Sequence, residues 1–488
     1  MRLSAASLDG LPAAVVRPGY DRERATIGVV HIGIGAFHRA HQAAVFDAAL
    51  ASGDNRWGIT GVSLRSATVR DQMEPQDGLY TLVERDGDAQ ALRIIGAVKD
   101  VLVAPEDPGA VVARLASPDV HIVTLTVTEK GYHLDPATGT LRTADAEIAA
   151  DLASLSAPRS APGFLVAGLA QRYAAGLPPF TALSCDNLPH NGARLRSAVL
   201  AIAAAHDPAL AEWIAAEGAF PQTMVDRIVP ATTVEDIAAL ADRIGVEDRA
   251  MVKTEPFLQW VIEDHFCGPR PDFAALGVQL TDDVAPWEEA KLRLLNGAHS
   301  GIAYLGGLAG IEHVDGFVAL PGGRAFVEAL WDESAATLTP PEGLDIVRYR
   351  AALMGRFANG SLAHRTRQIA MDGSQKLPQR LIAPVLARRE RGSGVEALAL
   401  AIAAWMRWQS GVDDAGEGFA VDDPLAAETA AALAGATTAA ERVAALLAIR
   451  AIFPAAVAQD AGLVATLTQA LERLEEQGAL GVLGGVSS

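Results

Sequence analysis

The sequence contains few of the residues that build disulfide or metal frameworks. Its 488 residues include two cysteines, Cys185 and Cys267, and neither belongs to a CxxC pair. Two cysteines are too few for a disulfide framework, which favours a reducing compartment. No HExxH segment and no other zinc-ligand spacing occurs in the chain, so we expect no metal ion at its functional site.

Long apolar runs and basic residues are also scarce. No uncharged apolar run reaches the roughly 18 residues of a membrane span, and the N-terminus lacks the apolar core of a signal peptide. The 40 basic and 59 acidic residues give a formal net charge of -19, which repels nucleic acid and anionic membranes. We therefore expect a cytoplasmic protein with no nucleic-acid or membrane partner, either monomeric or a small homo-oligomer.

Apolar residues are plentiful, at 50% of the chain, and the character of the sequence changes near Asp283. Before that point, short β-rich runs alternate with helical stretches. Beyond it, Ala- and Leu-rich helical stretches take over, including 394–409, 424–435, 438–452 and 463–477. We therefore predict two domains, an α/β domain at 1–283 and a mainly α-helical domain at 284–488.

The first clear structural signal is a strand followed by a glycine turn. The run Ile27 to Ile32 is typical of a β-strand, Gly33 and Gly35 follow it, and an Ala-rich stretch at 36–50 indicates a helix. This order lets backbone N–H groups hold a pyrophosphate. His38 stands where the third glycine of GxGxxG is expected, so an ordinary tight turn is the alternative.

A second predicted strand, Trp57 to Leu64, is followed directly by Arg65. In dinucleotide folds that use NAD, an Asp or Glu at this place usually binds the ribose hydroxyls, whereas an Arg can accept the phosphate of NADP. No acidic residue lies between this strand and Asp71. The residues by themselves leave the choice between NAD and NADP open.

Two later predicted strands end in polar clusters. The run 121–127 is followed by Thr128, and the run 180–184 is followed by the polar segment 185–192. Ligands gather at the carboxyl ends of parallel strands, so both clusters are candidates for one crevice. Asp, Asn, Pro and Gly are also the usual turn residues, and plain turn chemistry is the alternative.

The stretch that organises the rest of the chain is PWEEAKLRLLNGAHSG, residues 286–301. Its apolar residues have helical spacing, yet Lys291, Asn296 and His299 interrupt them. At about 100° per residue, Asn296 lies about 140° and His299 about 80° from Lys291, so all three fall within one sector of a helix. A lysine, an amide and an imidazole suit proton transfer at an alcohol oxygen. A solvated lysine beside two packed polar residues is the alternative.

The segment 364–380 gathers basic residues in an otherwise acidic protein. It contains Arg365, Arg367, Lys376 and Arg380, and Arg356 precedes it. Such a cluster is a candidate anion site. A solvated basic face is the alternative.

Six blocks of the chain together carry a family resemblance. They are GIGAFHRAHQA (33–43), TVTEKGY (126–132), SCDNLPHNG (184–192), MVDRIVP (224–230), EPFLQWVIED (255–264) and KLRLLNGAH (291–299). With these blocks in this order, most of the chain resembles the mannitol dehydrogenase family of polyol-specific long-chain dehydrogenases. The resemblance implies an α/β Rossmann-type N-terminal domain, a mainly α-helical C-terminal domain, an active site between them, and a metal-independent reaction with NAD.

The resemblance also implies roles for single residues. Lys291 is the expected general acid/base, Asn187 and Asn296 hold the reacting oxygen, and His299 positions the substrate. The expected cofactor residues are Gly33, Gly35, Phe37, Thr126 and Thr128, together with Arg65, which keeps NADP possible. The expected substrate side comprises Asp226 and Lys376 together with three predicted partners of a substrate carboxylate, Lys130, Arg365 and Arg380.

Within the family, HRTRQIAMDGSQKLPQRL (364–381) and TEKGY (128–132) look most like the fructuronate reductases, also called D-mannonate oxidoreductases. This implies reversible hydride transfer between D-mannonate and NAD, with D-fructuronate as the oxidised form. Gly360 and Ala363 replace a proline and an arginine expected in that group. A dehydrogenase of a neutral polyol such as mannitol or arabinitol is therefore one alternative, and a non-catalytic dinucleotide-binding sensor is another.

Overall fold

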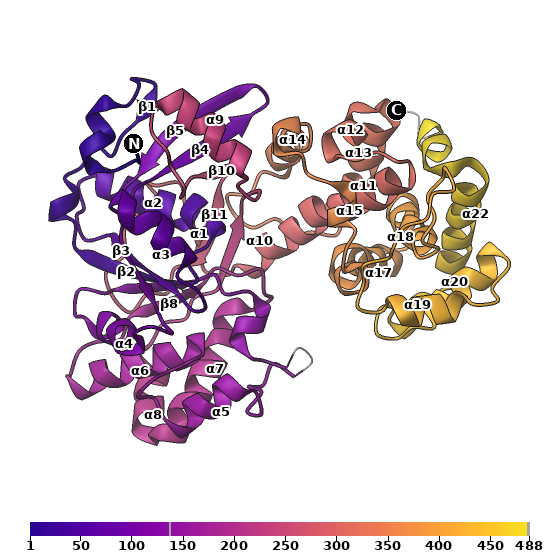
Figure 1. Cartoon of the computed structure of the whole chain (residues 1–488). Helices are drawn as coiled ribbons and strands as arrows, with labels where there is room; N and C mark the ends of the chain where they lie inside the picture. The colour runs from indigo at the N-terminus through magenta and orange to yellow at the C-terminus, as the bar shows by residue number, and fades with distance from the viewer. Residues whose placement is uncertain (136–137, 486–488) are drawn as a thin grey trace. The chain divides into compact units, whose positions relative to one another are not determined.

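The computed structural model describes residues 1–135 and 138–485. The chain forms two compact units, Met1–Val284 and Ala285–Ser488 (Figure 1). The sequence analysis placed the domain boundary between residues 283 and 284, and the observed division follows Val284.

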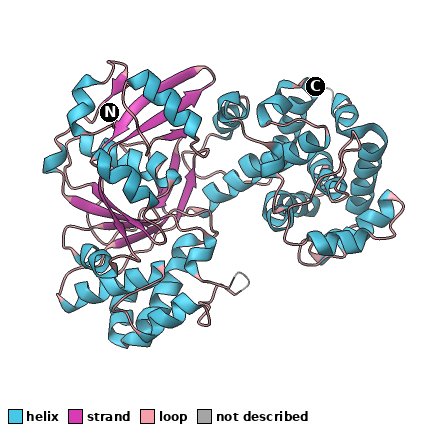
Figure 2. Ribbon diagram, in the orientation of Figure 1, coloured by secondary structure: helices cyan, strands magenta, loops and turns pink. Residues whose placement is uncertain are grey.

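The first unit is built around a five-stranded sheet in which every pair of neighbouring strands is parallel (Figure 2). Its order is β6-β3-β2-β7-β8. The bounds are Ile27–Ile32 for β2, Gly58–Ser63 for β3, Val98–Val103 for β6, Ile122–Leu125 for β7 and Thr181–Ser184 for β8. This is the order of a Rossmann-type sheet, and the order reverses beside β2, where ligands bind in such folds. The prediction of a Rossmann-type first domain is confirmed.

Both faces of this sheet are covered by packed apolar residues, the usual setting of a parallel sheet. Val30 and Ile32 of β2 belong to a core shared with helices on one face, whereas Val29 belongs to a core on the other face. Helices α4 (Pro108–Ala116), α6 (Ala161–Ala174), α7 (Asn191–His206) and α8 (Pro208–Glu217) supply the first core, and α2 (Gln42–Ala51) contributes to the second.

Two smaller sheets complete the first unit. Antiparallel strands β4 (Tyr80–Asp86) and β5 (Ala89–Ile95) form a hairpin, with β10 (Val252–Thr254) beside β4 and β1 (Val15–Val16) beside β5. The third sheet has the order β12-β11-β9, with bounds Gln279–Thr281, Gln259–Glu263 and Thr223–Asp226. The remaining helices of this unit are α3 (Thr68–Met73), α5 (Ala146–Ala153) and α9 (Val234–Ile244).

The single helix predicted after the glycine turn is divided into two. Helix α1 spans Ala36–Ala40, and α2 begins at Gln42. His41 breaks the helix with φ of -113° and ψ of -89°, and its Nε2 lies 2.9 Å from the carbonyl oxygen of Gln259 in β11. A tertiary contact with a strand more than two hundred residues away therefore overrides the local preference for one helix.

The second unit is mainly helical, with loops between its helices, which confirms the predicted mainly helical domain (Figure 2). Its centre is α11 (Gly297–Leu308), in which every residue is buried. Helices α13 (Pro321–Ala335), α15 (Thr366–Ile369) and α18 (Glu396–Trp408) pack against it. The other helices are α10 (Ala285–Ala290), α12 (Val314–Ala319), α14 (Ile346–Phe357), α16 (Gly373–Leu377), α17 (Ala383–Glu390), α19 (Ala426–Leu433), α20 (Ala439–Leu447), α21 (Ala455–Gln459) and α22 (Ala461–Gly484).

Two short π-helical segments interrupt the helices of this unit. The segment η5 covers Lys291–Asn296 and joins α10 to α11, and η7 covers Pro378–Ile382 and joins α16 to α17. The two segments pack against each other. π-helical turns are rare and concentrate at functional sites, which directs attention to this pair. None of the helices in the described part is sufficiently long and apolar to span a membrane.

Candidate active site

The turn after β2 contains two glycines that are needed for different reasons. Gly33 has φ of +94°, and a Cβ atom there would lie 2.2 Å from the carbonyl oxygen of Thr126. Only glycine fits this position without moving the end of β7. At Gly35, by contrast, the nearest atom to a Cβ would be the Gly33 carbonyl oxygen at 3.8 Å. This open backbone is what a pyrophosphate needs for close approach, so the residues present fit a dinucleotide.

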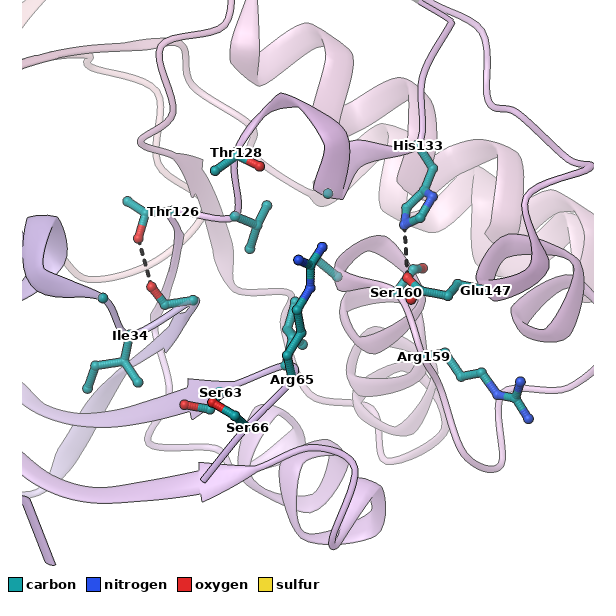
Figure 3. Close-up of a pocket in the computed structure, with 16 residues that line it drawn as sticks. Ile34, Ser63, Arg65, Ser66, Thr126, Thr128, His133, Glu147, Arg159 and Ser160 are labelled. Carbon is teal, nitrogen blue, oxygen red and sulfur yellow. Dashed lines mark hydrogen bonds and ion pairs between the residues drawn. The ribbon is translucent and has the colours of Figure 1, made fainter. Parts of the chain in front are cut away.

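A cavity of about 310 Å³ opens beside this turn (Figure 3). Predicted cofactor residues that line it are Gly33, Gly35, Arg65, Thr126 and Thr128. Lining residues that the sequence analysis did not single out include Ser63, His133, Glu147, Arg159 and Ser160. The last four follow the polar end of β7 by up to about thirty residues, and no local pattern marks them as neighbours of the glycine turn.

The predicted cofactor residue Phe37 has a different position. It lies in α1 and its ring stacks on His41, with the two ring centroids 5.1 Å apart. Its role in holding the dinucleotide remains a prediction.

Arg65 extends from the end of β3 into the middle of the residues that line the cavity (Figure 3). Among the described lining residues, Glu147 provides the carboxylate, and it pairs with His133 at 3.1 Å between Oε2 and Nε2. The end of β3 thus offers a guanidinium to a bound cofactor and no carboxylate of its own. This is the arrangement that left NADP open in the sequence analysis.

The half-buried carboxylate of Asp186 holds the chain where β7 ends. Asp186 accepts hydrogen bonds from the backbone N–H groups of Val127 at 3.0 Å and Thr128 at 2.9 Å, and from the hydroxyl of Tyr132 at 2.6 Å. Thr128 has φ of +65°, a conformation that threonine rarely adopts and that surrounding contacts must maintain. Burial raises the pKa of the Asp186 carboxyl. Asn187, the predicted amide of the active site, directly follows Asp186 in the sequence and is exposed.

In the second unit, the three residues of the organising stretch lie on the π-helical segment and the first turn of α11. Lys291 begins η5, Asn296 ends it, and His299 follows in α11. A π turn closes with a hydrogen bond between residues five apart, the spacing between Lys291 and Asn296. The π turn therefore brings Asn296 closer to the side of Lys291 than the 140° or so expected from a regular α-helix. Lys291 and His299 are both 7% exposed.

His299 is a buried imidazole in a basic setting. Its ring centroid lies 4.7 Å from that of Phe357 and 5.0 Å from that of His364. Burial lowers the pKa of His299 well below its usual value, and the nearby His364 ring and the positive charges of Arg356 and Arg380 lower it further. The ring is therefore neutral near pH 7. Within the described residues its buried Nε2 has no hydrogen-bond partner, as expected for a group that meets a ligand.

The predicted basic cluster separates into residues with different surroundings. Arg380 contacts Ser300 at 3.3 Å, and burial lowers the pKa of Arg380 to about 10. Lys376 donates to the carbonyl oxygens of Ile369 and Met371, and burial lowers its pKa. Arg365 is exposed and its Nε lies 3.6 Å from a carboxylate oxygen of Glu312. Of these three cations, Arg380 is the one that influences His299.

The remaining predicted substrate residues belong to the first unit. Lys130 is exposed in the short 3-10 turn Glu129–Tyr132, between Thr128 and Tyr132, which both donate to Asp186. Asp226 ends β9 opposite Gln259 and is 6% exposed. In the part of the chain that the structure describes, no three or more His, Cys, Asp or Glu side chains gather as they would around a metal ion.

Comparison with known proteins decides the family. The mannitol dehydrogenase Rossmann domain matches residues 27–275, and the mannitol dehydrogenase C-terminal domain matches residues 283–475. The chain belongs to the mannitol dehydrogenase family. As a member of this family it is an oxidoreductase that acts on a secondary alcohol, which confirms the prediction of an enzyme.

Relatives in the mannitol dehydrogenase family are similar over nearly the whole chain. The D-mannonate oxidoreductase of Escherichia coli K12 is 45% identical over 95% of this chain and 96% of its own. A mannitol 2-dehydrogenase of Pyrenophora tritici-repentis is 42% identical over 99% of this chain and 86% of its own. The structure of Pseudomonas fluorescens mannitol 2-dehydrogenase with NAD and D-mannitol superimposes with a TM-score of 0.85 at 39% identity, covering 100% and 99% of the two chains.

Proposed function

We propose that this member of the mannitol dehydrogenase family interconverts D-mannonate and D-fructuronate with NAD as the cofactor. The observation that carries the proposal is the buried, neutral His299 with an unpartnered Nε2, set among the cations Arg356 and Arg380. A carboxylated sugar needs such a cationic setting, whereas a neutral polyol does not. The similarity to a D-mannonate oxidoreductase supports the same substrate.

The cofactor is proposed to bind at the glycine turn of the first unit. When bound, NAD accepts the hydride in oxidation, and its reduced form supplies the hydride in the reverse direction. Gly35 leaves its backbone open to the pyrophosphate, and Thr128 and Arg65 line the same cavity. NAD is also present in the structure of the Pseudomonas relative.

Lys291 is proposed to move the proton. In the oxidation of D-mannonate, a hydride leaves C5 and the neutral Lys291 amine takes the proton of the C5 hydroxyl, which leaves a carbonyl group. In the reduction, the ammonium form of Lys291 returns that proton to the oxygen. The amides of Asn187 and Asn296 donate hydrogen bonds to the oxygen as negative charge grows on it. His299 donates through its free Nε2 to a substrate hydroxyl, because burial keeps the ring neutral.

The substrate carboxylate is proposed to meet Arg380, with Arg365 and Lys130 as further cations. Asp226 and Lys376 are proposed to bind hydroxyl groups. If this is right, replacing all three cations with Gln should raise the KM for D-mannonate by more than tenfold, because each charged hydrogen bond contributes about 1.5–3 kcal/mol. An unchanged KM in the triple variant would remove the carboxylate assignment.

The proposal is tested by following the appearance of reduced nicotinamide at 340 nm. The purified protein is given NAD with D-mannonate and, separately, with D-mannitol. Turnover of D-mannonate and none of D-mannitol is the expected result. Turnover of D-mannitol alone would overturn the substrate proposal while leaving the family chemistry in place.

Mannitol or another neutral polyol is the second candidate substrate. It is favoured by the exposure of Lys130 and by the pairing of Arg365 with Glu312, since both cations then have ordinary surface roles. The 42% identity to a mannitol 2-dehydrogenase supports it as well. NADP is the second candidate cofactor, because Arg65 stands at the end of β3. Replacing NAD by NADP in the same assay separates these two cofactors.

A further inference from the structure

A row of side chains crosses the sheet beneath the glycine turn. His31, the penultimate residue of β2, lies beside Thr124 of β7 in the parallel register. Its Nδ1 lies 2.7 Å from the hydroxyl oxygen of Thr124, and its Nε2 lies 2.9 Å from the hydroxyl oxygen of Thr126. The Thr126 hydroxyl in turn donates to the carbonyl oxygen of Gly33 at 2.9 Å. Nε2 of His31 also lies 3.3 Å from the same carbonyl oxygen, so the row ends on the backbone of the turn itself; Figure 3 shows its last hydrogen bond, from Thr126.

The order of donors in this row is determined by chemistry. Because the Thr126 hydroxyl gives its only proton to the Gly33 carbonyl, it must accept a proton from Nε2 of His31. Nε2 then carries the ring proton, and the unprotonated Nδ1 accepts from the hydroxyl of Thr124. A neutral imidazole with its proton on Nε2 satisfies both contacts at once.

The surroundings keep the His31 ring neutral and in place. His31 is fully buried, and the burial lowers its pKa to about 3. The ring of His38, from α1, stacks on it with a centroid distance of 3.4 Å and an angle of 11° between the planes. His38 is fully buried as well, and its pKa is lowered well below the usual value, chiefly by that burial. Neither ring is accessible to a ligand.

We infer that His31 and Thr126 are positioning residues that hold the glycine turn in the shape that receives the pyrophosphate. Gly33 alone has the required φ of +94°, but a glycine is also the residue most free to leave that conformation. Its carbonyl oxygen accepts from Thr126 and also from the backbone N–H of Gly35 at 2.7 Å. The hydrogen bond from the Thr126 hydroxyl fixes the Gly33 carbonyl and so directs the backbone of Gly35 toward the cavity. The inference rests on the proposed binding of a dinucleotide at this turn.

The test compares ligands that contain the pyrophosphate with one that lacks it. NADH, ADP-ribose and 5'-AMP are titrated by calorimetry into the wild type and into Thr126→Val, which keeps the shape of the side chain but removes the hydroxyl. NADH and ADP-ribose should bind about five- to tenfold more weakly, the usual effect of one lost hydrogen bond, while 5'-AMP binding stays within twofold. Thr126→Ser, which restores the hydroxyl, should restore affinity.

A matched control lies in the neighbouring strand. Thr60 of β3 is fully buried, and within the described residues its hydroxyl has no hydrogen-bond partner. Thr60→Val is the same chemical change in the same sheet, and it should leave all three affinities unchanged. Melting temperatures of all variants report on the fold independently of binding.

A double-mutant cycle separates positioning from direct contact. His31→Leu should reproduce the ligand pattern of Thr126→Val, although His31 cannot touch a ligand, and His31→Gln, which keeps an N–H donor, should reverse part of the loss. In the Thr126→Val background, His31→Leu should weaken binding less than it does alone, since part of its effect passes through the missing hydroxyl while the 3.3 Å contact of Nε2 with the Gly33 carbonyl oxygen remains to be lost. Equal weakening of 5'-AMP and ADP-ribose, or additive effects of the two variants, would overturn the inference. The wild-type titration with NADH separately tests the proposed cofactor.

Discussion

The turn after β2 and the π-helical segment η5 perform their proposed tasks by opposite means. At the turn the backbone is the functional group, because Gly35 exposes it to the ligand and Gly33 supplies a φ of +94°. At η5 the side chains of Lys291 and Asn296 are the proposed functional groups, and these two residues begin and end the π turn. The first kind of site is sensitive to any added atom, whereas the second is sensitive to the chemistry of each side chain.

The two regions also treat titratable groups differently. Beneath the turn, His31 and His38 are buried and stacked, and neither carries charge near pH 7. In the second unit, His299 is equally neutral but lies among cations. Neutral His31 serves as a fixed hydrogen-bonding group beneath the turn, whereas we propose that neutral His299 meets the substrate. Four changes would sharpen or break this contrast.

The largest effect is expected from Lys291→Ala. Loss of the general acid/base should lower kcat by at least about 100-fold, whereas the Kd for NADH should not change because the cofactor is proposed to bind at the glycine turn. Stopped-flow measurement of NADH formation and a fluorescence titration with NADH provide the two values. Lys291→Arg is the informative companion, since a guanidinium stays protonated and cannot act as a base. A kcat near that of the wild type in either variant would refute the assignment.

Gly33→Ala and Gly35→Ala form a matched pair at the turn. The new Cβ at position 33 would lie 2.2 Å from the Thr126 carbonyl oxygen, so Gly33→Ala should lower the free energy of unfolding by about 1–3 kcal/mol. Gly35→Ala meets no atom of the chain closer than 3.8 Å and should change stability by less than about 0.5 kcal/mol. Its affinity for NADH should nevertheless fall about tenfold, as measured by calorimetry.

This pair separates an effect on the fold from an effect on cofactor binding, because only Gly33→Ala is expected to disturb the fold. Normal NADH binding by Gly35→Ala would mean that the pyrophosphate does not lie against the turn. Normal stability of Gly33→Ala would mean that the end of β7 can move to accept a side chain.

A smaller effect is expected where Asp186 accepts hydrogen bonds from the chain at the end of β7. Asp186→Ala leaves the backbone N–H of Val127 and the hydroxyl of Tyr132 without their acceptor, and should lower the free energy of unfolding by about 1–3 kcal/mol. Thr128, which has φ of +65°, should then relax. Asn187, the residue after Asp186, should be displaced as a result, and kcat should fall. Urea unfolding and steady-state kinetics measure the two effects. Asp186→Asn keeps one acceptor oxygen and should be milder in both.

The last expected effect, which needs no substitution, is a dependence of stability on pH. In the unfolded chain His31 has a pKa of about 6.5, whereas in the folded protein burial lowers its pKa to about 3. The unfolded chain therefore binds a proton between pH 6.5 and 3 that the folded protein excludes. The stability due to this residue is complete above pH 6.5 and declines by about 1.4 kcal/mol for each pH unit below it. His38 has the same sign.

Urea unfolding at pH 7, 6 and 5 tests this expectation. The free energy of unfolding should fall across the series in the wild type, and the fall should be shallower in His31→Gln. An unfolding free energy that is constant from pH 7 to 5 would show that these imidazoles are not kept neutral.

Several features were accessible from the sequence because their causes are local. A β-rich run, two glycines and an Ala-rich stretch determine a strand, a turn and helical structure within about twenty-five residues, and β2, Gly33 and α2 are found there. The change to helical composition near residue 283 likewise marks the division after Val284. The spacing of Lys291, Asn296 and His299 predicts a common side of a helix from equally local information, and that common side stays a prediction because a π turn replaces the regular α-helix there.

Other features were decided only by tertiary structure, because they join residues far apart in the chain. The sequence does not reveal that Asp186 would hold Thr128, that His31 would reach Thr126, or that His41 would break a helix to contact Gln259. The sequence also gives no reason to distinguish Arg365 from Arg380. In the structure, Arg365 pairs with Glu312, whereas Arg380 lies near His299. Composition and spacing determined which chemical groups are present, and packing decided which of them are buried, neutral and aimed at one another.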